Sequence, residues 1–207
     1  MRKKHSCILI SALLVIIGAV CVYILCLTPP NRKTYREYSR PTSKVSEGKN
    51  DVQGIILHHT ATANGSRSLV VLQLDTTKEV SCHAIIDTDG TRYVLAEPTA
   101  RTWHAGYSML NGREKCNDFT IGIEFQGNTL EEPLTEDQIN SAIDYILPIM
   151  KKYNIPKKNI VTHKQVRAAW MAKHPDLVKE KGVKDKKDIT QKEYERFMSA
   201  LEERIDE

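Results

Sequence analysis

The chain has 207 residues and a formal net charge of +4, with 27% charged and 41% hydrophobic residues. The excess positive charge lies in residues 1–50, which hold nine basic and two acidic side chains, against 21 and 24 in residues 51–207. A basic surface for nucleic acid is therefore not expected, and residues 51–207 are long enough for one domain with a substantial core.

The N-terminal part predicts a membrane anchor. After a short basic N-terminus at 1–6, residues 7–27 are mostly apolar, and about 20 such residues cross a bilayer as a helix. The long apolar core without a small-residue exit site favours an uncleaved transmembrane helix over a signal peptide. Lipid attachment at Cys21 or Cys26 is a weaker alternative.

Basic residues flank the predicted anchor on both sides, so the positive-inside rule gives a weak orientation signal. The simpler topology places the domain that follows on the periplasmic or extracytoplasmic side of the cytoplasmic membrane; the reverse topology leaves it in the cytoplasm. Residues 28–50, which include Pro29-Pro30 and many charges, predict a linker to a single domain at 51–207.

The first half of that domain predicts mostly strands. A short apolar run from residue 54 ends at His58 and His59, and residues 66–76 have helical spacing. Strands are then expected at 81–87 and 91–96, joined by a hairpin turn at Asp89-Gly90, and at 120–125, where Glu124 interrupts an apolar run.

The second half predicts two helices and one more strand. Thr135 and Gln138 match a capping box, and apolar residues then recur at helical spacing as far as Tyr153. A short strand that ends at His163 is predicted at 159–163, and a closing helix is predicted at 191–204. This alternation predicts an α/β fold with a mixed central β-sheet flanked by helices.

Two cysteines, Cys82 and Cys116, lie in the predicted domain. The sequence allows one disulfide between them or two reduced, buried thiols.

Two predicted strands end in a histidine, and a strand between them carries a lone carboxylate. A catalytic zinc site typically has three protein ligands, an open position for water and a nearby acid–base group. His58, His163 and Glu124 are candidates for three of these parts. The third ligand is expected after His163, where Lys186-Lys187-Asp188 is a candidate segment.

Three blocks resemble one enzyme family: IILHHTA at 55–61, WHAG at 103–106 and NDFTIGIE at 117–124. They resemble the zinc N-acetylmuramoyl-L-alanine amidases, which include phage lysozyme-type amidases and animal peptidoglycan recognition proteins. The run 103–127 most resembles the bacterial anhydro-muropeptide amidases of cell-wall recycling. The resemblance covers about residues 52–200, with the blocks in the family's order.

The resemblance implies a Zn2+ cofactor held by His58, His163 and Asp188, with Glu124 as acid–base residue and Lys186 as catalytic lysine. One spacing differs, because the relatives of the recycling enzyme place the third ligand about ten residues after the second histidine and Asp188 lies 25 after it. Residues 171–185 would then be an insertion. The alternative third ligand is His174, 11 residues after His163.

The resemblance also implies substrate contacts at His104, Lys115 and Asn117. Lys115 stands where the recycling enzymes carry an arginine, and Cys82 where phage and animal members carry a catalytic tyrosine. His59 and His83 are expected to pack or to support the ligands, and Trp103 is expected in the core.

The expected function is hydrolysis of the amide bond between N-acetylmuramic acid and L-alanine in peptidoglycan or muropeptides. The expected partners are this substrate and the membrane, and the domain is expected to be a monomer. The alternative is a non-catalytic peptidoglycan-binding recognition module, a class that keeps the binding groove and loses metal ligands.

Overall fold

The computed structural model describes residues 33–62, 72–73, 77 and 79–206. The chain divides into two units, Met1–Thr34 and Tyr35–Glu207. The predicted anchor at 7–27 and most of the predicted helix at 66–76 lie outside the described residues. Among the described residues, no helix has the length and apolar character needed to cross a bilayer.

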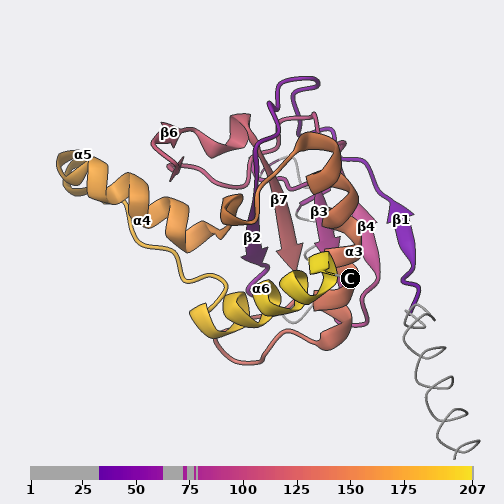
Figure 1. Ribbon diagram of the computed structural model, residues 1–207. Helices are drawn as coiled ribbons and strands as arrows, with labels where there is room; N and C mark the ends of the chain where they lie inside the picture. Colours follow the sequence, from indigo (N-terminus) through magenta and orange to yellow (C-terminus); the bar gives the residue numbers. More distant parts are fainter. Residues whose placement is uncertain (1–32, 63–71, 74–76, 78, 207) are drawn as a thin grey trace, which may run out of the picture. The chain divides into compact units, whose positions relative to one another are not determined.

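A mixed β-sheet forms the centre of the second unit (Figure 1). Within the described residues the sheet has six strands in the order β1-β4-β3-β7-β2-β8. Its bounds are β1 Glu37–Ser39, β2 Gly54–His59, β3 Ala84–Ile86, β4 Arg92–Val94, β7 Thr120–Phe125 and β8 Ile160–Thr162. Only the β3–β4 pair is antiparallel among them, and the predicted turn between these strands is confirmed, with Gly90 at φ +82°.

Two long helices, α3 (Glu136–Tyr153) and α6 (Gln191–Asp206), pack against one face of this sheet. Both were predicted, and the capping box of α3 is present, with Thr135 accepting from the Gln138 backbone N–H. The α/β fold with a mixed sheet and flanking helices is therefore confirmed. The remaining elements are β5 (Met109–Leu110), β6 (Arg113–Glu114), α4 (His163–Lys173), α5 (Pro175–Lys181) and the short 3₁₀ helices η2 (Cys116–Asp118) and η3 (Lys157–Asn159).

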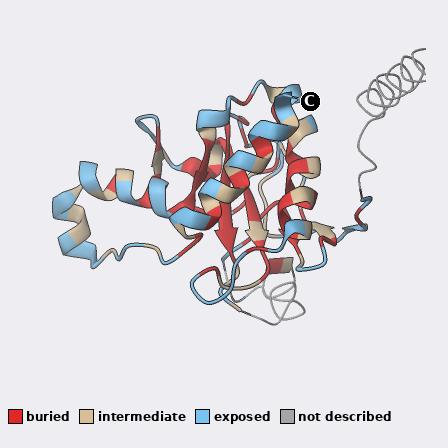
Figure 2. Cartoon of the chain, turned by 60° about the horizontal axis from the view of Figure 1, so that its bottom comes forward, coloured by how far each residue is buried: buried red, intermediate tan, exposed pale blue. Residues whose placement is uncertain are grey.

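Alternation along the central strands separates a core face from a functional face. Ile55 and Leu57 of β2, like Ile121 and Ile123 of β7, belong to the cluster that packs with α3 and α6, and Figure 2 shows buried residues concentrated along these strands. Successive side chains of a strand point to opposite faces. His58 and Glu124 therefore lie on the other face, at the carboxyl ends of neighbouring parallel strands, where they are Cα partners.

The folded unit begins earlier than predicted. Residues 35–50 were predicted as linker, but they belong to the second unit, and β1 pairs in parallel with β4. All three β1 residues are exposed, so the strand has no hydrophobic alternation that the sequence could reveal. Backbone pairing and the burial of Tyr35 and Thr42 fix this segment instead.

The segment around His163 also differs from the prediction. β8 ends at Thr162, and His163 is the first residue of α4 rather than the last residue of a strand. Thr162 and Gln165 form a capping box at this helix start. The predicted insertion at 171–185 forms the last turn of α4, then α5 and a following loop, and α4 and α5 extend to one side of the sheet (Figure 1).

The structure contradicts the prediction for Trp103 and decides between the two predicted states of the cysteines. Trp103 was predicted in the core, but its side chain is 38% exposed, with the Arg101 guanidinium 4.4 Å above its ring. This prediction was wrong because a cation held over one ring face lets the ring stay at the surface. Within the described chain, Cys82 and Cys116 are buried free thiols, the second of the two predicted states.

Candidate active site

Three potential metal ligands converge at the carboxyl ends of β2 and β8. His58, His163 and Asp188 are all buried, and one ligand atom from each lies within 4.8 Å of the others. His58 Nδ1 is 3.1 Å from His163 Nδ1, and Asp188 Oδ2 is 3.4 Å from each of these nitrogens. The loop after α5 therefore supplies the third group of the cluster.

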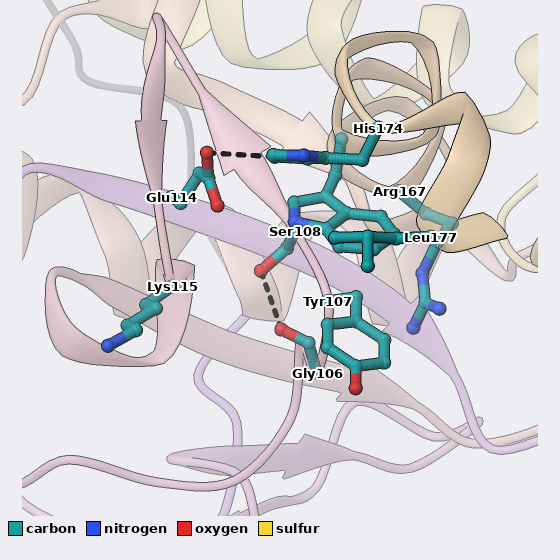
Figure 3. Close-up of a pocket in the computed structure, with 9 residues that line it drawn as sticks. Gly106, Tyr107, Ser108, Glu114, Lys115, Arg167, His174 and Leu177 are labelled. Atoms are coloured by element: carbon teal, nitrogen blue, oxygen red, sulfur yellow. Dashed lines mark hydrogen bonds and ion pairs between the residues drawn. The ribbon is translucent and has the colours of Figure 1, made fainter. Parts of the chain in front are cut away.

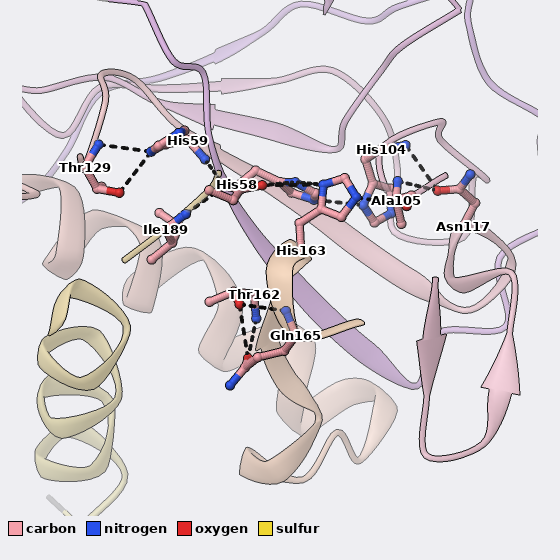
Figure 4. A network of polar contacts seen from close by, with 11 residues as sticks. His58, His59, His104, Ala105, Asn117, Thr129, Thr162, His163, Gln165 and Ile189 are labelled. Carbon is pink, nitrogen blue, oxygen red and sulfur yellow. Dashed lines mark hydrogen bonds and ion pairs between the residues drawn. The ribbon is translucent and has the colours of Figure 1, made fainter. Parts of the chain in front are cut away.

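Hydrogen bonds fix the two histidine rings through their outer nitrogens. His163 Nε2 lies 3.0 Å from the Ala105 carbonyl oxygen, which accepts only if that nitrogen carries the proton. His58 Nε2 lies 3.1 Å from Nδ1 of His104, as the row of rings in Figure 4 shows. With their outer nitrogens donating, both rings can present Nδ1 lone pairs to a metal ion, whereas without a metal a protonated Nδ1 can donate to Asp188 Oδ2. Such outer contacts orient metal-binding histidines in proteins.

The second oxygen of Asp188 is held by the backbone. Asp188 Oδ1 accepts from the backbone N–H of His59 at 2.8 Å and of Ile189 at 2.9 Å. Oδ2 is therefore left to face the histidines. The bond from His59 attaches the loop to the end of β2.

The charge states of Asp188 and His163 at neutral pH suit metal binding, whereas for His58 burial is outweighed by the hydrogen bond with Asp188 and the charge of Glu124, which raise its pKa. Burial would raise the pKa of Asp188, but hydrogen bonds with His163 and His58 outweigh it and hold the pKa well below its usual value. Burial lowers the pKa of His163 to about 4, and burial also holds the pKa of His104 well below its usual value. An ionised carboxylate and a neutral imidazole are the forms that bind metal ions.

Glu124 lies beside this cluster with an unused oxygen. Its Oε2 is buried and has no hydrogen-bond partner among the described residues. Burial, the largest cause, raises the pKa of Glu124 to about 7, against the lowering effects of His58 and Lys186. A carboxyl group with this pKa can gain or lose a proton near neutral pH.

A cavity of about 300 Å³, here called the metal cleft, opens beside these groups. It is lined by the three clustered residues, Glu124 and Lys186, and its rim includes the exposed Trp103. Lys186 lines the same cavity as Glu124 and His163, and its positive charge acts to lower the pKa values of both. The structure thus brings together the predicted ligands, the carboxyl group and the lysine.

The three residues predicted to contact substrate lie in different environments. His104 lines the metal cleft and contacts His58. Asn117 is buried, and its Oδ1 accepts from the backbone N–H groups of His104 and Ala105, so this side chain holds the loop that orients both metal-cluster histidines. Lys115 is exposed and lines a different pocket.

That second pocket, here called the α4 pocket, has a volume of about 540 Å³ and includes His174 (Figure 3). His174 Nε2 is 2.9 Å from a Glu114 carboxylate oxygen, and its ring lies 4.8 Å from that of Trp170. Asp188, not His174, therefore lies beside His58 and His163 within the described structure.

Sequence reasoning missed the helix that carries His163. Thr162 and Gln165 have the spacing of a capping box, and this signal could have predicted a helix beginning at His163. The supporting roles of His59 and His83 were expected. The His59 ring contacts Thr129, and His83 is fully buried with its Nε2 2.9 Å from the Ala100 oxygen.

Comparisons with known proteins point to one enzyme family. A family model described as N-acetylmuramoyl-L-alanine amidase matches residues 48–177, which contain His58, Glu124 and His163 but end before Lys186 and Asp188. The chain is 47% identical over 87 residues to the 1,6-anhydro-N-acetylmuramyl-L-alanine amidase AmpD of Haemophilus influenzae, a match that covers 41% of this chain and 46% of that protein.

A second relative is the N-acetylmuramoyl-L-alanine amidase AmiD of Escherichia coli, 28% identical over 130 residues, with 56% of this chain and 46% of AmiD covered. The chain thus spans about half the length of these relatives. The solved structure of the N-acetylmuramoyl-L-alanine amidase LysC from Clostridium intestinale is similar at a TM-score of 0.52 and 26% identity, over 70% of this chain and 99% of LysC. The family model covers more than half of the sequence, so this chain belongs to the N-acetylmuramoyl-L-alanine amidase family.

Proposed function

We propose that this protein is a zinc-dependent N-acetylmuramoyl-L-alanine amidase that hydrolyses the bond between N-acetylmuramic acid and L-alanine in peptidoglycan or muropeptides. The observation that carries the proposal is the convergence of His58 Nδ1, His163 Nδ1 and Asp188 Oδ2 beside a buried carboxyl group. Family membership supports the same reaction.

The donor set fits a zinc ion. Two imidazole nitrogens and one carboxylate oxygen are zinc ligands, and three protein ligands leave a position for water or substrate. Without a metal ion these three atoms come together only if a histidine Nδ1 carries a proton and donates to Asp188, and a bound cation would take the place of that proton. Zinc held there would polarise the substrate carbonyl and lower the pKa of a water molecule.

In this proposal Glu124 moves the proton. Its free Oε2 accepts a proton from the attacking water, and the carboxyl group then protonates the leaving amine of L-alanine. A pKa of about 7 suits both directions of transfer at neutral pH. The neighbouring Lys186 contributes a positive charge where negative charge develops on the carbonyl oxygen.

Digestion of purified muropeptides tests the proposal, with products identified by mass spectrometry. We expect free peptides that begin with L-alanine. Glu124→Gln keeps the size of the side chain and removes its acid–base function, so the rate should fall by about 10²–10⁴. Zinc content measured in parallel should remain equal in the two proteins.

A matched control is Glu131→Gln, which removes one charge from an exposed glutamate outside the metal cleft. This variant should keep the wild-type rate. Wild-type turnover by Glu124→Gln would overturn the role of Glu124. Binding of muropeptides without any cleavage by the zinc-loaded wild type would support a recognition module instead, although the complete set of ligands favours hydrolysis.

We further propose that residues 7–27 anchor the enzyme in the cytoplasmic membrane, with the catalytic unit outside and monomeric. The apolar length of this segment supports the anchor. Protease accessibility of the catalytic unit in intact spheroplasts should show digestion. Protection that is lost only after lysis would place the unit in the cytoplasm.

A further inference from the structure

The loop that supplies Asp188 is held a second time, two residues further along the chain. Thr190 directly precedes α6, and its backbone N–H donates to the hydroxyl oxygen of Thr129 at 3.1 Å. Thr129 belongs to the loop between β7 and α3. This hydrogen bond therefore joins the loop after the strand that carries Glu124 to the loop that carries the candidate third metal ligand.

The His59 ring ties Thr129 to the end of β2. The backbone N–H of Thr129 donates to His59 Nδ1 at 3.0 Å, so this nitrogen acts as an acceptor and carries no proton. The Thr129 hydroxyl lies 2.9 Å from the same nitrogen (Figure 4). Because its oxygen accepts from Thr190, the hydroxyl can donate its own proton to His59. One buried hydroxyl thus bridges a ring on β2 and the backbone of the ligand loop.

These contacts and those of Asp188 form one connected set. His59 donates its backbone N–H to Asp188 Oδ1 at 2.8 Å, and its ring contacts Thr129. The same residue therefore holds the ligand directly and, through Thr129, the backbone of Thr190. Ile189 lies between the two held positions and is buried. A loop that is fixed on both sides of the ligand needs little rearrangement to keep Oδ2 towards the histidines.

The loop that carries Thr129 has anchors of its own at both ends. Near its start, the backbone N–H of Gly127 donates to the Thr60 hydroxyl at 3.1 Å. Near its end, the backbone N–H of Leu134 donates to the buried Glu193 carboxylate of α6 at 2.9 Å. Thr129 is therefore a fixed point to which the ligand loop is attached.

We propose that Thr129 is a positioning residue of the metal site. Its hydroxyl bridges the His59 ring and the Thr190 backbone. This bridge sets the place of the Asp188 carboxylate beside the two histidine ligands. The role rests on the zinc-dependent function proposed above. Thr129 lies outside the lining of the metal cleft, so within the described structure it acts on the site only through its neighbours.

Zinc affinity of the full chain, measured by chelator competition, tests this role. Thr129→Val keeps the branched shape and leaves the Thr190 N–H without its acceptor. Zinc affinity should fall about 10- to 100-fold, the usual loss when a group that supports a metal ligand is removed. Thr129→Ser keeps the hydroxyl and loses only a methyl group, so it should restore most of the affinity. Rescue by serine separates loss of the hydrogen bonds from loss of packing.

Thr42→Val is the matched control for stability. The Thr42 side chain is as buried as that of Thr129, and its hydroxyl also donates one hydrogen bond and accepts another. Thr42 does not line the metal cleft. Both valine variants should unfold at lower urea concentrations than the wild type, because each loses buried hydrogen bonds. Only Thr129→Val should lose zinc affinity.

Steady-state hydrolysis of a muropeptide at saturating zinc gives a second measurement. Thr129→Val should lower kcat, because a displaced ligand alters the geometry in which water and carbonyl react. KM should stay nearly unchanged, since Thr129 does not line the cleft that receives the substrate. A rise in KM with kcat unchanged would contradict a role in positioning the metal ligand.

The zinc measurement needs no cleavage, so it separates this role from the amidase function. Wild-type zinc affinity in Thr129→Val, or an equal fall in Thr42→Val, would overturn the role of Thr129 and leave the amidase function standing. Equal losses in Thr129→Val and Thr129→Ser would overturn it as well. A wild-type protein that bound no zinc would instead overturn the proposed metal site, and the role of Thr129 with it.

Discussion

The candidate site has two parts that are held in different ways. His58 and Glu124 form a sheet-borne half, and Asp188 forms a loop-borne half. His58 and Glu124 are Cα partners on parallel strands whose other faces are packed against α3 and α6. Asp188 lies in the loop between α5 and α6, and a hydrogen bond from the backbone N–H of His59 at the end of β2 holds it there. Changes in the core face of these strands should therefore affect global stability, whereas changes in the loop should affect metal binding more than stability.

The largest effect is expected from Asp188→Asn. The amide oxygen can still accept from the two backbone N–H groups, but the amide nitrogen then presents a donor to His58 and His163. Zinc affinity should fall by more than about 100-fold, beyond the usual loss for a residue that only supports a ligand. Chelator competition measures the affinity, and activity should be lost with it.

The matched control is Asp176→Asn, an exposed carboxylate on α5. It should bind zinc like the wild type. Full zinc affinity in Asp188→Asn would mean that the loop-borne half does not contribute a ligand.

A core substitution tests the sheet-borne half. Ile123 precedes Glu124 in β7 and is fully buried on the opposite face. Ile123→Ala should lower the free energy of unfolding by about 2–5 kcal/mol, because it removes buried methyl groups and leaves a cavity. Ile205→Ala, at a side chain that is 41% exposed, should change this free energy by less than about 0.5 kcal/mol.

Urea unfolding of the zinc-free proteins measures both changes, since bound metal would add its own contribution to stability. If Ile123→Ala retained zinc affinity in its folded state, the two halves would be separable. Wild-type stability in that variant would contradict the role assigned to the core face.

The sequence predicted the sheet-borne half better than the loop-borne half for a physical reason. The apolar runs of β2 and β7 are local patterns, and the polar residues that end or interrupt them, His58 and Glu124, could be identified from the sequence. The choice between Asp188 and His174 depended on where the chain returns after α4 and α5, which no local pattern specifies. Only the folded chain brings Asp188, 25 positions beyond His163, back to the end of β2.

The missed strand has a related cause. The three residues of β1 are exposed, and their strand conformation comes from pairing with β4, so the sequence resembled a linker. By contrast, α4 had a local signal in Thr162 and Gln165 that could have been used. The pairing of β1 with β4 left no pattern in the sequence, whereas the capping box of α4 did.

A pH-dependent effect is expected from His83, which lies under the sheet-borne half. Burial lowers the pKa of His83 to about 4, whereas an unfolded histidine titrates near 6.5. Between these values the unfolded chain binds more protons than the folded one, so stability should fall as the pH drops from 6.5 towards 4. The loss from this residue should reach about 3 kcal/mol near pH 4.

Urea unfolding at several pH values compares the wild type with His83→Gln. The variant should be less stable at pH 7, because His83 Nδ1 accepts from the Gly122 backbone N–H. Its stability should nevertheless change less steeply with pH. Parallel pH profiles for the two proteins would contradict a neutral, buried His83.

The smallest effect is expected at the start of α4, where strand β8 ends at Thr162 and the helix begins with His163. The Thr162 hydroxyl accepts from the Gln165 backbone N–H at 3.2 Å. Thr162→Ala should lower the free energy of unfolding by about 1 kcal/mol, whereas Thr162→Ser keeps the oxygen and should cost only a few tenths. Because β2 still fixes His58 and the loop still fixes Asp188, zinc affinity should fall much less in Thr162→Ala than in Asp188→Asn. An equal loss of zinc in these two variants would mean that the helix start, and not the loop, limits the assembly of the site.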